Sequence, residues 1–452
     1  MSDQTKPSEY LTVVDSRTKR DYKIGIDNNS VRAIDFRRIT PPGAGTAADS
    51  QIESGLTIFD RGFLNTACVE SSITRIDGKI GSLQYRGLSV EHLFEHHDYE
   101  EVLHLLIWGH LPSAMEKLQL RGALATEMKV PENVLDTIRA FPRDSPTFPM
   151  VIGGLSAYAA VDEGSAAVRS EHQSYYLGNM QAIDAAIIRT IATVATTVAL
   201  VYCHKRGREF IPVDPHGSFV GNMLLMMGVV RDTKDVSEVE KCLQRLWILY
   251  ADHEMTNSTA AFLHAASTLT DPLSSTISGI VSAYGPLHGG AIDLAYKGFE
   301  QIGTVDKVPY LIQAVKSKKQ RLFGFGHRIY KTIDPRTKLI RQMIDEQLGV
   351  HTNKADKMPL LQVALEIDRI ARTDTYFTSR NLHANADLYG ALLYTALGFE
   401  TDIIIAMACT SRMAGVMAHW REAMQQPPML WRPQQLYVKP TSRKDRTGQQ
   451  ET

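Results

Sequence analysis

Apolar residues recur every three or four positions along most of the chain after residue 89, and this spacing predicts a mostly α-helical protein. The pattern is clearest between residues 183 and 201, where one helical face would carry Ile183, Ile187, Ile191, Val194, Val198 and Val201. It returns around residues 217–230, 238–250, 256–270, 308–316, 360–371, 388–397 and 402–421. Strand signals after residue 90 are few and short, and the lack of a fixed repeat argues against a helical solenoid.

The two ends of the chain lack this helical pattern. Residues 1–55 are polar and rich in turn formers, and the alternation of apolar and polar positions in residues 11–14 and 22–26 permits a small hairpin. Residues 441–452 are charged and contain no apolar anchor, which is typical of a disordered tail. The helical body is therefore expected between these two segments.

The composition is that of a soluble globular protein. A length of 452 residues allows a large core, and the hydrophobic fraction of 44% and charged fraction of 22% fall in the usual range. The longest apolar stretch, residues 182–202, contains Asp184 and Arg189. These charges favour a buried helix over a membrane span.

Charge and cysteine content exclude several classes of function. The net charge is −1 and the basic residues are scattered, so the chain shows no electrostatic footprint for nucleic acid. The basic run at residues 316–321 is either a solvated helix end or a place where phosphates bind. The four cysteines show no paired metal-ligand spacing and are too few for a disulfide framework, which indicates a reducing compartment. Because residues 1–10 resemble neither a secretory nor a transit signal, we expect a cytoplasmic protein.

Candidate chemistry gathers in three short clusters. The most informative is GFGHRIYKTIDPR at residues 324–336, which combines glycines with His327 and the fixed positive charges of Lys331 and Arg336. The sequence GPLHGGA at residues 285–291 precedes it, and NAD at residues 385–387 follows it. Together the clusters predict an active site for an anionic carbonyl compound.

Each histidine of these clusters allows a functional and a structural interpretation. His288 immediately precedes a predicted helix, whose dipole would disfavour protonation, so that a neutral ring could donate a hydrogen bond to a carbonyl or enolate oxygen. It could equally be a turn histidine satisfied by the backbone. His327 lies in a glycine-flanked loop that suits a carboxylate or phosphate, although glycine and histidine also occur together in ordinary turns.

The charged candidates are also open to two interpretations. Asp387 comes just before an apolar run, so it is either a general base with a raised pKa or the N-cap of a helix. Arg412 interrupts a strongly apolar helix, and a buried arginine requires either a structural carboxylate partner or a bound anion. Arg432, which lies between Trp431 and Pro433, is a similar candidate.

Taken together, these segments resemble the citrate synthase family from about residue 55 to residue 439. Residues 324–336 fit the family signature at every defining position, and GPLHGGA at 285–291 also agrees. Further matches follow the family order, with ADHE at 251–254, NST at 257–259, AHW at 418–420 and RPQQLYV at 432–438.

The resemblance implies a Claisen-type condensation of an acyl-CoA with oxaloacetate, followed by hydrolysis of the thioester. Asp387 would take a proton from the carbon next to the thioester carbonyl, and neutral His288 would stabilise the resulting enol or enolate. His327 would polarise the ketone of oxaloacetate and supply the proton of the new alcohol. No metal and no bound prosthetic group is implied, since acyl-CoA enters as a co-substrate.

The resemblance also implies the binding residues and the assembly. Arg336, Arg412 and Arg432 would hold the carboxylates of oxaloacetate, with Arg432 reaching in from the other subunit of a homodimer. The residues expected to face CoA are Gly324, Phe325, Gly326 and Lys331. No nucleic acid or membrane partner is expected.

The implied fold is all-α, with a smaller helical domain that closes over the substrates. The expected division is a polar segment at 1–55 that includes the hairpin, a large helical domain at 56–290 and 398–440, a small helical domain at 291–397 and a disordered tail at 441–452.

The chain departs from the family pattern at several flanking positions. Phe148 replaces a histidine that helps bind oxaloacetate, Val416 replaces a tryptophan, and His383 with Ala384 replaces a Tyr-Pro pair. Because the principal acid, base and arginine positions are intact, the pattern predicts an alkylcitrate synthase of secondary metabolism that accepts a medium-chain acyl-CoA. The alternatives are an ordinary citrate synthase using acetyl-CoA, a 2-methylcitrate synthase using propionyl-CoA, and a non-catalytic helical scaffold.

Overall fold

The structure is a computed structural model that describes residues 9–42, 55–170, 175–229, 236–348 and 358–438. Its contacts divide the chain into two units, one formed by residues 1–70 with 432–452 and the other by Ser71–Trp431. The predicted disordered tail at 441–452 lies outside the described residues.

The first unit contains the predicted hairpin. Strands β1 (Glu9–Asp15) and β2 (Arg20–Ile26) pair antiparallel, in a register that runs from Glu9 opposite Ile26 to Asp15 opposite Arg20. The Asp15 carboxylate stabilises the connecting turn, since it accepts hydrogen bonds from the backbone and side chain of Arg17. The 3-10 helix η1 (Ala33–Arg38) follows the hairpin.

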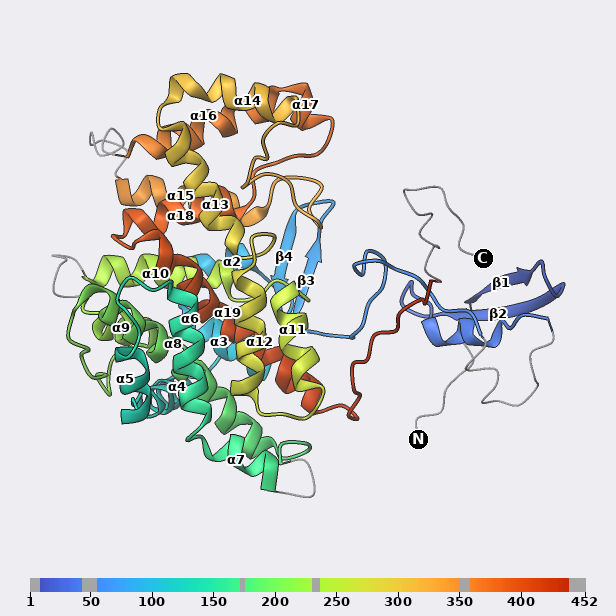
Figure 1. Cartoon of the computed structure of the whole chain (residues 1–452), viewed down its shortest axis with the longest axis horizontal. Helices are drawn as coiled ribbons and strands as arrows, with labels where there is room; N and C mark the ends of the chain where they lie inside the picture. The colour runs from blue at the N-terminus through green and yellow to red at the C-terminus, as the bar shows by residue number, and fades with distance from the viewer. Residues whose placement is uncertain (1–8, 43–54, 171–174, 230–235, 349–357, 439–452) are drawn as a thin grey trace, which may run out of the picture. The chain divides into compact units, whose positions relative to one another are not determined.

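The second unit is almost entirely helical (Figure 1), which confirms the predicted all-α class. It begins with a small antiparallel sheet of β3 (Thr74–Asp77), β4 (Ser82–Tyr85) and β5 (Leu88–Ser89). The helices of its first half are α2 (Val90–His96), α3 (Tyr99–Trp108), α4 (Ala114–Glu127), α5 (Glu132–Arg139), α6 (Thr147–Ala159), α7 (Glu163–Ser170), α8 (Met180–Arg206), α9 (Phe219–Met226) and α10 (Val236–Tyr250). Those of its second half are α11 (Asn257–Ala266), α12 (Pro272–Tyr284), α13 (Gly290–Ile302), η3 (Val305–Lys307), α14 (Val308–Lys316), α15 (Pro335–Leu348), α16 (Pro359–Thr373), α17 (Thr375–Thr378), α18 (Ala386–Ala396) and α19 (Thr401–Met424).

Helix α8 forms the centre of the core, as its apolar stripe predicts. All six stripe residues are buried, and the helix packs against α4, α6 and α19. The two charges within its apolar stretch are paired, Asp184 with Arg421 at 2.7 Å and Arg189 with Asp162 at 2.8 Å. Helices α8 and α19 are both long and apolar enough to cross a membrane, but most of each lies inside the fold. The composition of α8 is therefore explained by packing.

Helix α19 is held by the segment that follows α10. The backbone N–H of Gly415 donates to the carbonyl of Ala251 at 3.0 Å, and Tyr99 Oη donates to the carbonyl of Ser411 at 2.7 Å. Asp252 lies fully buried beside this contact, and a Cβ on residue 415 would come within 2.1 Å of its Oδ1. Only glycine allows the segment to approach the helix this closely.

Helices α13 to α18 lie together at one end of the second unit (Figure 1). They cover most of the range predicted as a small domain at 291–397, and the division into a large and a small moving domain stays a prediction.

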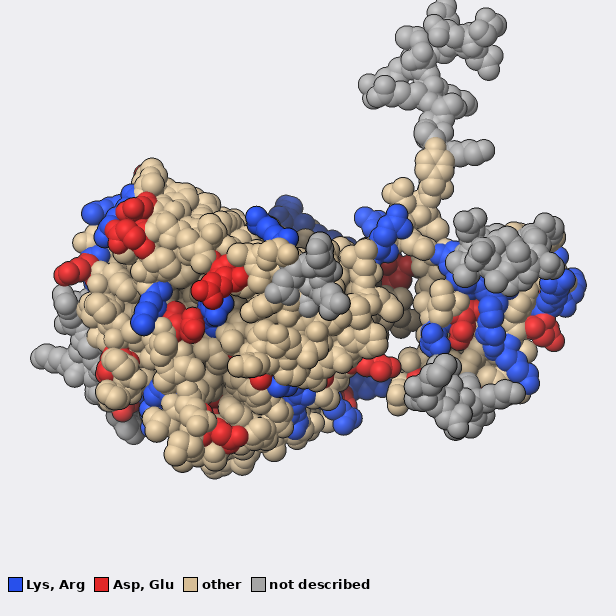
Figure 2. Space-filling view, turned by 90° about the horizontal axis from the view of Figure 1, so that it is seen from below, with Lys and Arg blue, Asp and Glu red and all other residues tan. Residues whose placement is uncertain are grey.

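On the face seen in Figure 2, acidic and basic side chains are interspersed.

The close approach at Gly415 leads to a stability prediction. Gly415→Ala should lower the free energy of unfolding by about 1–3 kcal/mol, the usual cost of overpacking a core, because the new methyl group overlaps Asp252. The measurement is equilibrium urea unfolding followed by circular dichroism.

The matched control is Gly298→Ala in α13, where an added Cβ would meet nothing within 4 Å. That change should be neutral or should stabilise the protein by about 0.5–1 kcal/mol, because alanine favours a helix interior. Equal midpoints for the two variants would contradict the packing argument.

Candidate active site

A cavity of about 430 Å³ lies in the second unit, beside the first turns of α11, α15 and α18 and the middle of α19. The structure brings five of the predicted residues to its wall, although they come from distant parts of the sequence. These residues are His288, His327, Arg336, Asp387 and Arg412. The three sequence clusters therefore meet in one site.

His288 is held as a neutral ring with a defined tautomer. Its Nε2 lies 3.3 Å from the backbone N of Ser258 and 2.8 Å from the Ser258 hydroxyl. A backbone N–H can only donate, so Nε2 is the acceptor and Nδ1 carries the proton. Burial, together with the positive charge of Arg412, lowers the pKa of His288 to about 4. The ring is thus satisfied by backbone, and Nδ1–H remains a hydrogen-bond donor.

His327 has the opposite tautomer for the same physical reason. Its Nδ1 accepts from the backbone N–H groups of Ile329 at 3.1 Å and Tyr330 at 3.3 Å, so its proton is on Nε2. Burial and the charge of Arg336 lower the pKa of His327 to about 4. At neutral pH the two histidines are therefore uncharged donors.

Arg336 is buried in a bidentate ion pair with Asp334. Its Nε lies 3.0 Å from Oδ1 and its Nη2 lies 2.7 Å from Oδ2. Burial alone would raise the pKa of Asp334, but the charge and hydrogen bonds of Arg336 outweigh it and lower that pKa. Asp334 Oδ2 also accepts from the backbone N–H of Ala386 at 3.3 Å, so the pair fixes the start of α18.

Asp387 sits in the first turn of α18 without capping it. The cap is Asn385, whose Oδ1 accepts from the Asp387 backbone N–H at 3.0 Å, so the interpretation of Asp387 as the N-cap is wrong. Within the described residues, no hydrogen bond reaches the Asp387 carboxylate. Burial raises its pKa to about 6, although Arg336 acts in the opposite direction. This pKa suits a base that works near neutral pH.

Arg412 enters the cavity from the middle of α19. Its Nε donates to the carbonyl of Tyr250 at 2.6 Å, and in the described parts of the chain no carboxylate lies within ion-pair distance of it. Burial lowers the pKa of Arg412, an effect that Asp252 partly offsets. Of the two alternatives that the sequence left open, a bound anion is the one this geometry favours.

His253 is a cavity residue that was not among the sequence candidates. It is buried, its Nε2 lies 3.2 Å from Tyr330 Oη, and its ring centroid is 5.2 Å from that of His327. Burial, Arg336 and Arg412 hold its pKa well below the usual range for histidine. The signal in the sequence was the ADHE motif itself, which was noted for resemblance and not for chemistry.

The remaining predicted residues do not line the cavity. Lys331 is exposed and donates to the carbonyl of Arg328 at 3.2 Å. Gly324 and Gly326 have φ angles of +80° and +79°, and their backbones bond to residues 383–385, as does Phe325 through a bridge to Ala384. The glycines of this loop are therefore required by backbone packing near α18. The CoA-binding role of these four residues stays a prediction.

Two further expectations concern Arg432 and Phe148. Arg432 is exposed and belongs to the first unit, so it is not brought to the cavity wall. Phe148 was expected in the oxaloacetate pocket, and this is wrong. It is buried in the first turn of α6 and stacks on Tyr284 with ring centroids 4.5 Å apart. The loss of a histidine there therefore changes core packing, because the side chain faces another ring and not the cavity.

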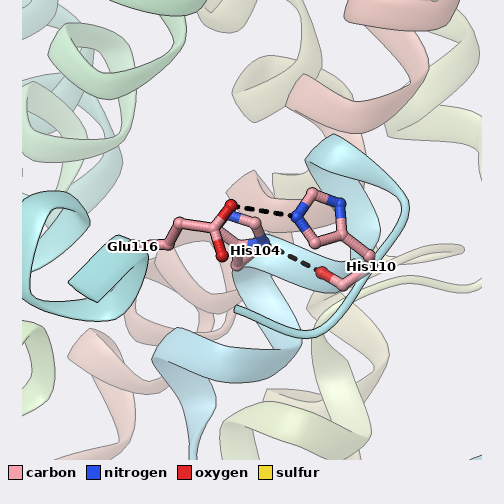
Figure 3. Close-up of side chains that lie close together, drawn as sticks. All are labelled: His104, His110 and Glu116. Atoms are coloured by element: carbon pink, nitrogen blue, oxygen red, sulfur yellow. Dashed lines mark hydrogen bonds and ion pairs between the residues drawn. The ribbon is translucent and has the colours of Figure 1, made fainter. Parts of the chain in front are cut away.

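A group of possible metal ligands lies outside the cavity. The ligand atoms of His104, His110 and Glu116 are within 4.8 Å of one another (Figure 3). Their contacts serve the α3–α4 connection: His104 Nδ1 bonds to the carbonyl of His110 at 2.9 Å, and Glu116 forms a capping box with Ser113. The prediction that the reaction requires no metal is independent of this group.

Comparisons with known proteins agree with the geometry. Residues 62–434 match the family model described as citrate synthase, C-terminal domain. The chain is 44% identical to the citrate synthase-like protein oryE of Aspergillus oryzae, over 95% of this chain and 96% of that one. It is 38% identical to the alkylcitrate synthase tstJ of Talaromyces stipitatus, over 97% and 95% respectively.

Among solved structures, a Thermoplasma acidophilum citrate synthase in ternary complex with carboxymethyl coenzyme A and oxaloacetate superposes with a TM-score of 0.75. It is 28% identical, and the match covers 84% of this chain and 96% of that one.

The histidine environments predict a spectroscopic result. The rings of His288 and His327 should stay neutral down to about pH 5, because burial and neighbouring arginines lower both pKa values to about 4. Nitrogen-15 NMR of labelled histidine should show the Nδ1–H tautomer for His288 and the Nε2–H tautomer for His327, with His288→Asn and His327→Asn as assignment controls. A titration near pH 6.5 for either ring would contradict the proposed environment.

Proposed function

The chain belongs to the citrate synthase family, whose members condense an acyl-CoA with oxaloacetate, and we propose that its own acyl-CoA is longer than acetyl-CoA. The products would be CoA and an alkylcitrate of secondary metabolism. The observation that supports the chemistry is the convergence of a carboxylate of raised pKa, two neutral histidine donors and two arginines on one cavity. Two relatives that are alkylcitrate synthases, at 38% and 39% identity, support the acyl substrate.

The first step is formation of the enol. Asp387 removes a proton from the carbon next to the thioester carbonyl, which requires the carboxylate form and therefore a pH above about 6. His288 donates its Nδ1–H to the thioester oxygen, where negative charge develops. Because His288 is neutral, it stabilises the enol by donating a hydrogen bond. A protonated ring, in contrast, could give its proton to the Asp387 carboxylate and so remove the base.

The second step joins the two substrates. The carbon of the enol attacks the ketone carbon of oxaloacetate, and His327 donates from Nε2 to the ketone oxygen, which becomes the alcohol. Water then hydrolyses the thioester: its oxygen joins the carbonyl carbon, one of its protons restores the Nε2–H of His327, and CoA leaves as a thiol with the proton that Asp387 took from the acyl carbon. Closing the cavity during condensation would keep water away from the acyl-CoA until the new bond exists.

The arginines account for the choice of oxaloacetate. Among the described residues, Arg336 and Arg412 each keep guanidinium N–H groups that bond to no protein acceptor, and planar donors of this kind match a carboxylate. His253 lines the same cavity, with its ring centroid 5.2 Å from that of His327, and would add a third polar contact. Since the arginines supply the positive charge, the reaction requires no metal and no bound cofactor. Residues 324–326 and Lys331 would contact CoA.

We propose that a second copy of the chain completes the site with Arg432. The cavity is formed by residues 71–431, whereas Arg432 is exposed and belongs to the first unit. A homodimer that exchanges this arginine would give oxaloacetate a third guanidinium. The cytoplasmic location stays a prediction, since the relatives include a glyoxysomal and a peroxisomal citrate synthase.

The proposed function predicts a chain-length profile. Purified protein with oxaloacetate should release free thiol from acyl-CoA substrates, with kcat/KM highest for hexanoyl- to decanoyl-CoA in a series from acetyl to decanoyl. Asp387→Asn should lower kcat by about 10²- to 10⁴-fold, because it removes the base.

The matched control is Asp293→Asn, an aspartate that pairs with Lys297 on the surface of α13 and should leave kcat unchanged. An optimum at acetyl-CoA would return the protein to ordinary citrate synthase activity, and an optimum at propionyl-CoA would indicate 2-methylcitrate synthesis. No thiol release from any pair would contradict the assignment of condensing activity.

The shared-site proposal predicts complementation between two inactive variants. Arg432→Gln and Asp387→Asn should each be inactive alone, but subunit exchange in an equal mixture should restore roughly a quarter of wild-type activity. Half of the dimers would be mixed, and each mixed dimer would contain one intact site. Native mass spectrometry would show that the subunits have exchanged. If activity did not recover after that exchange, Arg432 would not contribute to the partner's site.

A further inference from the structure

Behind the reaction cavity lies a second, smaller hollow between helices α11, α12 and α19. Four residues border both spaces, namely Ser258, Ala283, Cys409 and Arg412. The far wall of the hollow is formed by Phe262, Ile280, Met413 and Val416, with Gly279 and Thr276 between them. Its volume is about 30 Å³. The hollow is therefore an extension of the reaction cavity into the core.

Each wall helix passes from the reaction cavity to the hollow within one turn. Phe262 follows Ser258 by four residues on α11, and Val416 follows Arg412 by four residues on α19. Residues four apart lie on the same helix face, so the groups that hold the reactants lie directly above the apolar side chains. The apolar side chains of the hollow therefore lie one helical turn from the residues that hold the reactants.

The polar residues that line the hollow, Ser258, Thr276 and Arg412, each bond to a group that does not line it. The Ser258 hydroxyl bonds to His288 at 2.8 Å, and the Thr276 hydroxyl donates to the carbonyl of Pro272 at 2.8 Å. Arg412 directs its Nε to the carbonyl of Tyr250. Burial raises the pKa of the Cys409 thiol to about 12, so it remains an uncharged thiol that packs like a small apolar group. An apolar hollow of this kind binds hydrocarbon better than water.

From this geometry we infer that the hollow holds the alkyl end of the acyl-CoA, as a subsite for chain length. The inference rests on the proposed function. The thioester oxygen binds at His288, and His288 is held by Ser258, so the carbon chain of the acyl group begins beside the shared border. A chain that leaves this point toward α12 and α19 buries its methylene groups against Phe262, Ile280 and Val416.

The volume of the hollow determines which side chains must move to admit a longer acyl chain. A volume of 30 Å³ accommodates roughly one or two methylene groups. Additional carbons require side chains of the far wall to change rotamer, and Met413 is suited to this because its thioether side chain is flexible. Gly279 is more constrained, since a Cβ there would lie 3.2 Å from the carbonyl of Ser258 and would require that backbone to shift slightly.

The test changes the volume of the hollow in both directions and measures selectivity as a ratio of kcat/KM for octanoyl-CoA to that for acetyl-CoA. Val416→Leu and Val416→Phe fill the hollow progressively, and the ratio should fall about 10-fold or more, the range that one methylene is worth in an apolar pocket. Ile280→Ala enlarges the hollow by three carbons and should move the optimum toward longer chains. Because each ratio compares two substrates on one protein, a general loss of folded enzyme cancels.

The matched control is Ile277→Ala, the same substitution one turn earlier on α12 at a partly buried position that does not line the hollow. Its ratio should stay within about twofold of wild type, because no wall of the hollow changes. Circular dichroism of every variant shows which of them fold.

The outcomes separate this inference from the proposed function. A wild-type protein that uses only acetyl-CoA would overturn the proposed function and the chain-length subsite together. A wild-type protein that uses longer chains, but whose ratio is unchanged in both Val416→Phe and Ile280→Ala, would overturn only the subsite. Opposite shifts in the filled and enlarged variants would establish it.

Discussion

The buried ion pair between Asp334 and Arg336 is the interaction on which the site depends. It joins the first turn of α15 to the first turn of α18, because Asp334 also accepts the backbone N–H of Ala386. Asp387 follows directly, so the pair fixes the position of the base. Burial lowers the pKa values of His327 and His253, and the charge of the same guanidinium lowers them further. Removing one partner would leave an uncompensated buried charge at a cost of about 3–5 kcal/mol, and both geometry and electrostatics would change at once.

The two histidine donors show how backbone amides select a tautomer. In each ring one nitrogen accepts from N–H groups that cannot reverse their role, so the other nitrogen must carry the proton. Burial then keeps both rings uncharged at neutral pH. Asp387 is shifted in the opposite sense, since burial raises the pKa of a carboxyl group and lowers that of a histidine. One buried environment therefore prepares a base and two neutral donors together.

Much of this arrangement could be predicted from the sequence, and the rest fails for identifiable reasons. The stripe of α8 and the three clusters around His288, His327 and Asp387 are local patterns, and local patterns report helix faces and residue chemistry well. The N-cap of α18 is Asn385, two residues before Asp387. Local sequence does not fix the start of a helix to within two residues, so these two candidates could not be distinguished. The position of Phe148 depends on tertiary packing against Tyr284, which no local pattern reports. His253 was missed because a histidine gains its role only from neighbours distant in the sequence.

The residues that bind the charged and carbonyl groups are separate from those that line the apolar hollow. The preferred acyl chain length can therefore change while the reaction stays the same. Arginines and neutral histidines meet the charged and carbonyl groups on one side of Ser258, and the far wall beyond it is formed mainly by Phe262, Ile280, Met413 and Val416. Val416 and Ile280 make no hydrogen bond to the reacting groups, so a change in their volume alters the space for an alkyl chain and leaves the ion pair and the tautomers in place. A Cβ at Gly279 would lie 3.2 Å from the carbonyl of Ser258, whose hydroxyl bonds to His288, so a change at Gly279 would also press on a residue that holds the site. Chain-length preference should therefore change most readily on α19 and at Ile280 of α12, and least readily where α12 touches α11.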